Sequence, residues 1–194
     1  MLIHGLIECS RVNGPGRRAV IFLQGCRLGC AGCWNVASHA FEGVEHGSDD
    51  IAAWLRGCSG IDGVTFSGGE PMHQVNEVLR VAGGAEPGLS LGLFSGYTER
   101  ELTAGRYWTR FAATDSERRE WWRALRTRLD FAVLGRYVQA RPAVAPLRTS
   151  ANQALHLFTD RYRESDFAPP EVEVTIGDAG LVRITGFPTA GLPA

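Results

Sequence analysis

The chain has 194 residues, of which 44% are hydrophobic and 21% charged, so it is long enough for one domain with its own core. The formal net charge is -1, so the protein has no overall positive charge that would attract nucleic acid. All 20 basic residues are arginine, which excludes catalysis through a lysine nucleophile or Schiff base. The five cysteines are odd in number and three are clustered, which favours a metal or redox site over a secreted disulfide framework. No apolar run could span a membrane and the first residues lack a signal-peptide pattern. We therefore expect a cytoplasmic protein that binds neither nucleic acid nor membrane.

Short apolar segments recur along the first 160 residues and predict the strands of a sheet. The expected strands are residues 2–8, 19–24, 63–66, 89–94 and 130–134. Several are continuous apolar runs, as in a sheet that is buried on both faces.

Helical patterns lie between these strands. We expect one helix N-capped by Ser48 and stopped near Gly57, and a second over residues 74–82. A capping box, Thr114 to Glu117, opens a third, with an apolar stripe of Trp122, Leu125 and Leu129. The repetition of strand, helix and strand predicts parallel βα units that close wholly or partly into a barrel.

The last part of the chain has a different pattern. Pro169 and Pro170 break the repeat, and residues 171–176 and 181–185 flank a turn sequence at 177–180 with apolar and polar residues in alternation. This is typical of a β-hairpin. We therefore expect an α/β core over residues 1–160 and an antiparallel extension over 161–194 in the same globular unit.

The cysteine cluster carries the strongest chemical signal in the sequence. Cys26, Cys30 and Cys33 have the spacing C-x3-C-x2-C. Three interpretations fit this spacing: zinc completed by His39, a [4Fe-4S] cluster completed by Cys9 or Cys58, or a cluster on three thiolates with one iron open to a substrate.

The residues around the cysteines bear on this choice. Gly25, Gly29 and Gly32 would let the loop wrap around a large inorganic cluster. The segment Ser67-Gly-Gly-Glu-Pro71 follows an expected strand, where two glycines permit close backbone approach to a ligand and Glu70 could accept from an ammonium group. The same segment also suits an ordinary strand-to-helix turn.

Together, these motifs resemble the radical S-adenosylmethionine (SAM) enzymes, and most closely the activating proteins of glycyl radical enzymes such as anaerobic ribonucleotide reductase. The resemblance extends over roughly residues 5 to 158. Its further matches are Gly14–Arg17, Phe22–Cys26, Cys33–Asn35, Ser95–Thr98, Asp130–Arg136 and Leu147–Gln153.

The resemblance implies an α/β fold, a partial (β/α)6-type radical SAM barrel with a C-terminal β-hairpin extension. It also implies that Cys26, Cys30 and Cys33 hold a [4Fe-4S] cluster whose fourth iron binds SAM, and that the GGE turn binds the methionyl amine. The SAM contacts it suggests are Gly32, Trp34, Asn35, Ser67, Gly68, Gly69, Glu70, Ser95 and Asp130.

The implied reaction is reductive cleavage of SAM to a 5′-deoxyadenosyl radical, which takes a hydrogen atom from a glycine of a partner enzyme. A flavodoxin or a ferredoxin-type protein would supply the electron. Two alternatives stay open. One is a single-cluster radical SAM catalyst that modifies a peptide or small molecule in a biosynthetic pathway, and the other is a non-catalytic zinc or electron-carrier module.

Overall fold

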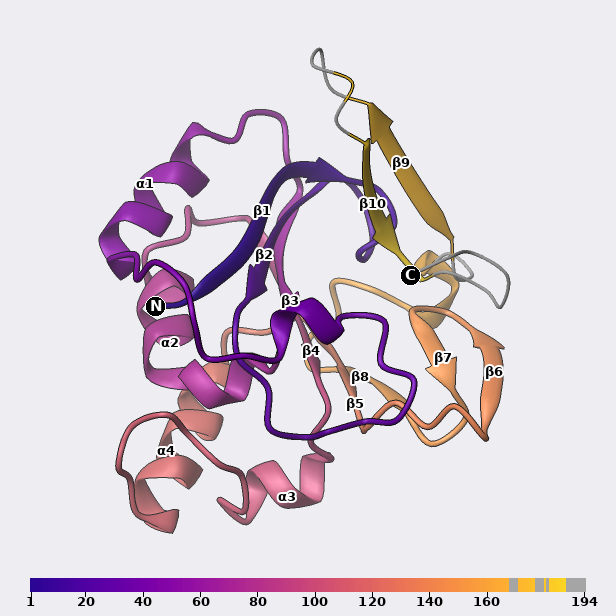
Figure 1. The fold of residues 1–194 in the computed structure, drawn as a ribbon. Helices are drawn as coiled ribbons and strands as arrows, with labels where there is room; N and C mark the ends of the chain where they lie inside the picture. Colours follow the sequence, from indigo (N-terminus) through magenta and orange to yellow (C-terminus); the bar gives the residue numbers. More distant parts are fainter. Residues whose placement is uncertain (168–170, 177–179, 181, 188–194) are drawn as a thin grey trace.

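The computed structural model describes residues 1–167, 171–176, 180 and 182–187. Its centre is a six-stranded sheet with the strand order β1-β2-β3-β4-β5-β8 (Figure 1). The five expected strands all form, with ends within two residues of the predicted ones. The strands are β1 (Ile3–Ser10), β2 (Arg18–Leu23), β3 (Gly63–Gly68), β4 (Ser90–Ser95), β5 (Phe131–Leu134) and β8 (Ala154–Leu157).

The strands β2 to β5 are parallel neighbours, whereas β1 runs antiparallel to β2 and β8 runs antiparallel to β5. The parallel βα repeat expected from the sequence is therefore present in the four central strands. Parallel pairing requires a long crossover, usually a helix. Only residues 11–17 join β1 to β2, and no helix lies among them, so this pair is antiparallel.

Helices connect the parallel strands and pack together on one face of the sheet (Figure 1). Their bounds are α1 (Ser48–Gly57), α2 (Val75–Gly83), α3 (Glu99–Thr103) and α4 (Asp115–Arg126), with short 3-10 turns at η1 (Val36–Ser38), η2 (Pro71–Gln74) and η3 (Glu164–Asp166). None of the helices in the described residues has both the length and the apolar character needed to cross a bilayer.

The helix ends test the capping predictions. The capping box at Thr114 and Glu117 is confirmed, since the Glu117 amide donates to the Thr114 hydroxyl and the Thr114 amide donates to the Glu117 carboxylate. The Ser48 prediction is wrong by one residue, because Gly47 has the extended backbone of an N-cap and its amide donates to Asp50. Leu129 lies beyond the end of α4 but is fully buried, as its place in the predicted stripe requires.

The main core lies between the sheet and these helices. It joins apolar side chains of the central strands to the inward faces of the helices, including Ile21, Phe66, Leu93, Leu55, Val78, Trp122 and Leu125. Because β2 to β5 are held by this core, their carboxyl ends are fixed relative to one another.

A second, smaller core lies around β5 and the last part of the chain. Phe131, Val133, Leu147 and Phe167 are buried together, and Phe187 packs against them. In the chain between β5 and β8, the strands β6 (Pro142–Ala145) and β7 (Arg148–Ser150) pair antiparallel and form a separate two-stranded sheet.

The predicted C-terminal hairpin is present. The strands β9 (Val172–Ile176) and β10 (Val182–Gly186) pair antiparallel and form a separate two-stranded sheet beside the body of the protein (Figure 1). Residues 177–179 of its turn and Leu181 lie outside the described residues.

Arginine is usually solvated or paired with a carboxylate, and Arg18 departs from this rule. Arg17 is exposed, but Arg18 is fully buried at the start of β2. Its guanidinium donates to the carbonyls of Pro15, Val64 and Ser90 and to two hydroxyls, so hydrogen bonds to neutral groups replace the expected solvent.

Candidate radical SAM site

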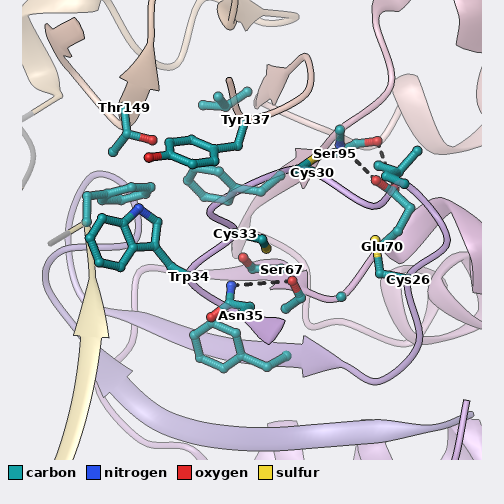
Figure 2. A pocket seen from close by; sticks show the side chains of 18 of the residues that line it. Cys26, Cys30, Cys33, Trp34, Asn35, Ser67, Glu70, Ser95, Tyr137 and Thr149 are labelled. Atoms are coloured by element: carbon teal, nitrogen blue, oxygen red, sulfur yellow. Dashed lines mark hydrogen bonds between the residues drawn. The ribbon is translucent and has the colours of Figure 1, made fainter. Parts of the chain in front are cut away.

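A cavity of about 390 Å³ lies at the carboxyl ends of the parallel strands (Figure 2). The segments that follow β2, β3, β4 and β5 each contribute to its wall, as is usual for ligand sites in α/β proteins. Ten of the twelve predicted site residues line it: Cys26, Cys30, Cys33, Trp34, Asn35, Ser67, Gly68, Gly69, Glu70 and Ser95.

Gly32 and Asp130 are the two predicted residues that do not line the cavity. Gly32 is exposed within the cysteine loop. Asp130 precedes β5 and therefore lies at the opposite end of the strand. Its carboxylate accepts from the Leu91 amide at 3.1 Å and from the Thr159 hydroxyl at 2.7 Å, so its contacts are with neighbouring backbone and loop.

The three cysteines of the loop are free thiols that face this shared cavity (Figure 2). Burial raises the pKa of Cys26 to about 11, against the lowering effect of a hydrogen bond from the Leu28 amide. Burial also raises the pKa of Cys30, and the Tyr137 amide and Arg136 oppose that rise. Both thiols are therefore protonated at neutral pH, and a metal centre bound here must displace their protons.

The other candidate metal ligands are arranged differently. His39 Nε2 lies 3.3 Å from Cys33 Sγ, so the histidine of the zinc alternative is beside the third cysteine. Cys9 is exposed on the edge strand β1 and Cys58 follows α1, and neither of these possible fourth ligands lines the cavity. Among the described residues, no three His, Cys, Asp or Glu side chains converge as a single metal ion requires.

Glu70 is a fully buried carboxylate in the wall of the cavity. It accepts hydrogen bonds from the Met72 amide at 2.9 Å, the Ser95 hydroxyl at 2.8 Å and the Gly96 amide at 2.7 Å. Burial raises its pKa to about 7, although these bonds oppose the rise. Within the described part of the chain, no cationic side chain forms a salt bridge with it.

The GGE turn is bonded directly to the start of the cysteine loop. The Gly69 amide donates to the Leu23 carbonyl at 2.7 Å, and the Glu70 amide donates to the Gly25 carbonyl at 3.0 Å. A Cβ atom at Gly69 would lie 2.6 Å from the Gly25 oxygen, and Gly68 has a φ of +98°. The glycines are therefore needed for this backbone contact, and the turn is more than an ordinary strand-to-helix connection.

Trp34 and Asn35 lie on the loop directly after the third cysteine. Trp34 Nε1 is buried and has no hydrogen-bond acceptor among the described residues, as expected where a ligand completes the site. The Asn35 side chain makes no cap hydrogen bond to η1, and it lines the cavity. Its Nδ2 donates to the Gly68 carbonyl at 3.4 Å, a second link between the loop and the GGE turn.

Several cavity residues were not predicted individually. Tyr137, Thr149 and Gln153 come from or directly follow two segments that the sequence marks as matches, at residues 130–136 and 147–153. The hairpin residues 184–187 also line the cavity, but the sequence predicts only a strand that ends at residue 185 and no part in a site.

Comparison with known proteins identifies the class. Residues 12–156 match the family described as the 4Fe-4S single cluster domain, and the chain belongs to this family. The relatives bear names that agree with the resemblance to radical SAM activating proteins.

The anaerobic ribonucleoside-triphosphate reductase-activating protein of Vibrio cholerae is 32% identical over 171 residues, which cover 82% of this chain and 99% of the relative. The protein of the same name from Pasteurella multocida is 30% identical over 76% of this chain and 92% of its own length. The pyruvate formate-lyase-activating enzyme of Listeria monocytogenes is 36% identical over 40% of this chain and 34% of its own length.

Proposed function

We propose that the chain is a radical SAM activating enzyme that generates a glycyl radical on a partner protein, an anaerobic ribonucleotide reductase. The observation that carries this proposal is the joint arrangement around a single cavity of three free thiols and one buried carboxylate that has no cationic partner among the described residues. The names of the relatives, which include the activating proteins of two glycyl radical enzymes, point to the same reaction.

The residues of the cavity fit a [4Fe-4S] cluster and SAM. Cys26, Cys30 and Cys33 would supply the cluster ligands, since thiolates are the usual ligands of such clusters. Glu70 would bind the ammonium of the methionyl group, because a buried carboxylate without a cationic partner is stabilised by a bound cation. Ser95 would act through Glu70, since its hydroxyl donates to that carboxylate.

Trp34 and the backbone of the GGE turn complete the proposed SAM site. The indole can stack on the adenine, and its unpartnered Nε1 can donate to the ligand. When bound, a reduced cluster would supply one electron that cleaves SAM to methionine and a 5′-deoxyadenosyl radical, which takes a hydrogen atom from the glycine Cα.

The fold supports a finer proposal about architecture. The four parallel strands and their helices form the central part of a partial radical SAM barrel, with residues 1–160 as the core and 161–194 as an extension of the same unit. A flavodoxin or a ferredoxin-type protein is the proposed electron donor.

Anaerobic reconstitution with iron and sulfide tests the proposal. We expect the wild type to bind about four irons per chain, absorb broadly in the visible, and cleave SAM when reduced with dithionite. Cys30→Ala should lose both properties. Cys58→Ala, which removes a thiol outside the cavity, is the matched control and should retain them. Stoichiometric zinc without iron, or SAM cleavage by Cys30→Ala, would contradict the proposal.

The contact between His39 and Cys33 favours one second candidate, a zinc module with three cysteines and one histidine. This candidate does not explain why Glu70 is buried without a cation on the same cavity. The two candidates predict different metals in the reconstituted protein.

A further inference from the structure

The C-terminal hairpin exposes its apolar face to solvent. In the β9–β10 pairing, Val174 lies opposite Ile184 and Ile176 lies opposite Val182, so the four side chains share one face. Their exposed fractions are 56%, 54%, 71% and 54%. A two-stranded sheet normally turns its apolar face inward, and a contiguous exposed apolar patch indicates a binding surface.

The polar face of the hairpin is bonded to the body of the protein at Thr185 and Glu173, while Thr175 and Arg183 on the same face are exposed. Asn13 Nδ2 donates to the buried Thr185 hydroxyl at 3.0 Å, and the Arg11 amide donates to Glu173 at 3.3 Å. These bonds fix which face points outward. The apolar face is therefore a feature of the folded protein, held by hydrogen bonds on its opposite side.

The apolar face, defined here as Val174, Ile176, Val182 and Ile184, is continuous with the cavity. Ile184 belongs to both, and residues 185–187 continue along the cavity wall. The Phe187 ring packs on Phe94 of β4 with centroids 5.5 Å apart, which anchors the end of β10 at the cavity. A macromolecule that enters the cavity along this wall would therefore contact the apolar face.

We propose that the apolar face binds an apolar surface of the substrate protein next to the glycine that enters the cavity. The inference rests on the proposed function, since only a protein substrate would bring such a surface to the cavity. The hairpin also lies beyond residue 156, where the match to the family ends, so it is suited to recognise the partner of this particular chain.

Two other occupants fit the face less well. The described hairpin strands carry one arginine and one glutamate and have no basic rim of the kind that anionic lipid surfaces attract. A stable dimer buries about 1,200–2,000 Å² in total, and four aliphatic side chains per copy supply only a small part of that area. A substrate protein that also contacts the cavity rim gains the additional area.

The test uses the double variant Val174→Thr/Ile176→Thr in the cluster-loaded protein. Threonine keeps the β-branched shape that a strand favours and removes apolar surface. The control is Val144→Thr on β6, which is 83% exposed and does not line the cavity. The probe is the anaerobic ribonucleoside-triphosphate reductase of the same organism, with binding measured by sedimentation and glycyl radical measured by electron paramagnetic resonance.

We expect the double variant to bind the reductase about tenfold more weakly and to form less radical at limiting reductase. Partner-free SAM cleavage with dithionite should match the wild type, and Val144→Thr should match it in every assay. The inference would be overturned if the wild type and the double variant bound the reductase equally, or if the control weakened binding as much as the double variant. It would also be overturned if the wild type did not bind, or if the wild type were a dimer that the double substitution dissociates. Failure of the wild type to cleave SAM would instead count against the proposed function, and the binding measurement would still decide the inference.

Discussion

Among single residues, Glu70 links the stability of the ligand-free protein to pH. Burial raises its pKa from 4.5 to about 7, so between these values the folded state keeps a proton that the unfolded state has released. Stability is therefore lost as pH rises through this window, by roughly 3 kcal/mol. We predict that Glu70→Gln removes this loss, as measured by urea unfolding of the cluster-free protein at pH 5 and pH 8.

The control for this experiment is Glu42→Gln, which changes an exposed carboxylate outside the cavity. Only the difference in unfolding free energy between the two pH values is compared, because the glutamine amide also faces the Gly96 amide and weakens the site at every pH. An unchanged pH dependence in Glu70→Gln would contradict the prediction.

His39 distinguishes the two metal interpretations. If the site holds a [4Fe-4S] cluster on three thiolates, His39 only contacts the Cys33 ligand. We then predict that His39→Ala retains about four irons per chain after anaerobic reconstitution, measured by iron analysis and visible absorbance. Loss of most of the bound metal in His39→Ala would instead identify the histidine as a ligand, as in a Cys3His zinc site.

We expect the buried hydrogen bonds of Arg18 to stabilise the folded protein. Replacing it by methionine leaves the carbonyls of Pro15, Val64 and Ser90 without their present donor inside the protein. Each unsatisfied buried group costs about 1–3 kcal/mol, so we predict a loss of at least about 3 kcal/mol in urea unfolding. Arg17→Met changes the exposed neighbour and should have little effect. A loss below about 1 kcal/mol in Arg18→Met would be inconsistent with this account.

At the level of elements, Phe167 holds the C-terminal extension to the sheet. Its ring packs on Phe131 with centroids 5.1 Å apart and on Tyr162 at 5.9 Å, within the second core. We predict that Phe167→Ala lowers the unfolding free energy by about 3–5 kcal/mol, because a large buried ring leaves a cavity. Chemical denaturation measures this loss. Phe111→Ala, at a ring that is 36% exposed, should cost much less, and similar losses in both would argue against a second core.

For the whole molecule, SAM should stabilise the fold only when the cluster is present. A ligand at one hundred times its Kd stabilises by about 2.7 kcal/mol, which corresponds to a rise in Tm of roughly 5–10 °C for a chain of this size. Thermal unfolding of the reconstituted and cluster-free proteins with and without SAM measures the effect. An equal rise in the cluster-free protein would show that binding does not require the cluster.

The elements that the sequence predicted well are those with a strong local pattern. The five apolar strands and the box at Thr114 depend on nearby residues. The motifs that follow strands also bring ten of the twelve candidate residues to one cavity, and their roles there stay predictions. The errors concern placement in space. Asp130 is predicted as a site residue from its motif, but it precedes β5 instead of following it. The strand β8 is not predicted, and its antiparallel direction depends on pairing that no local pattern encodes.

The sequence also could not predict that Arg18 is buried or that the apolar face of the hairpin points outward. An arginine at a strand start is usually solvated, and only the convergence of Pro15, Val64 and Ser90 makes a buried position favourable. The alternation in β9 predicted two different faces correctly, but the side that faces the body is decided by Asn13 and Arg11, far away in the chain.

The bonds between the GGE turn and the cysteine loop have a consequence for protein engineering. Because Gly69 and Glu70 are held by the carbonyls of Leu23 and Gly25, the two motifs are one structural unit made from two distant segments. Grafting the loop alone into another scaffold would transfer the thiols without the backbone that positions them. A transplant would have to carry both segments, with glycine retained at 69, and a designed cluster protein that borrows from this chain should treat them as a single cassette.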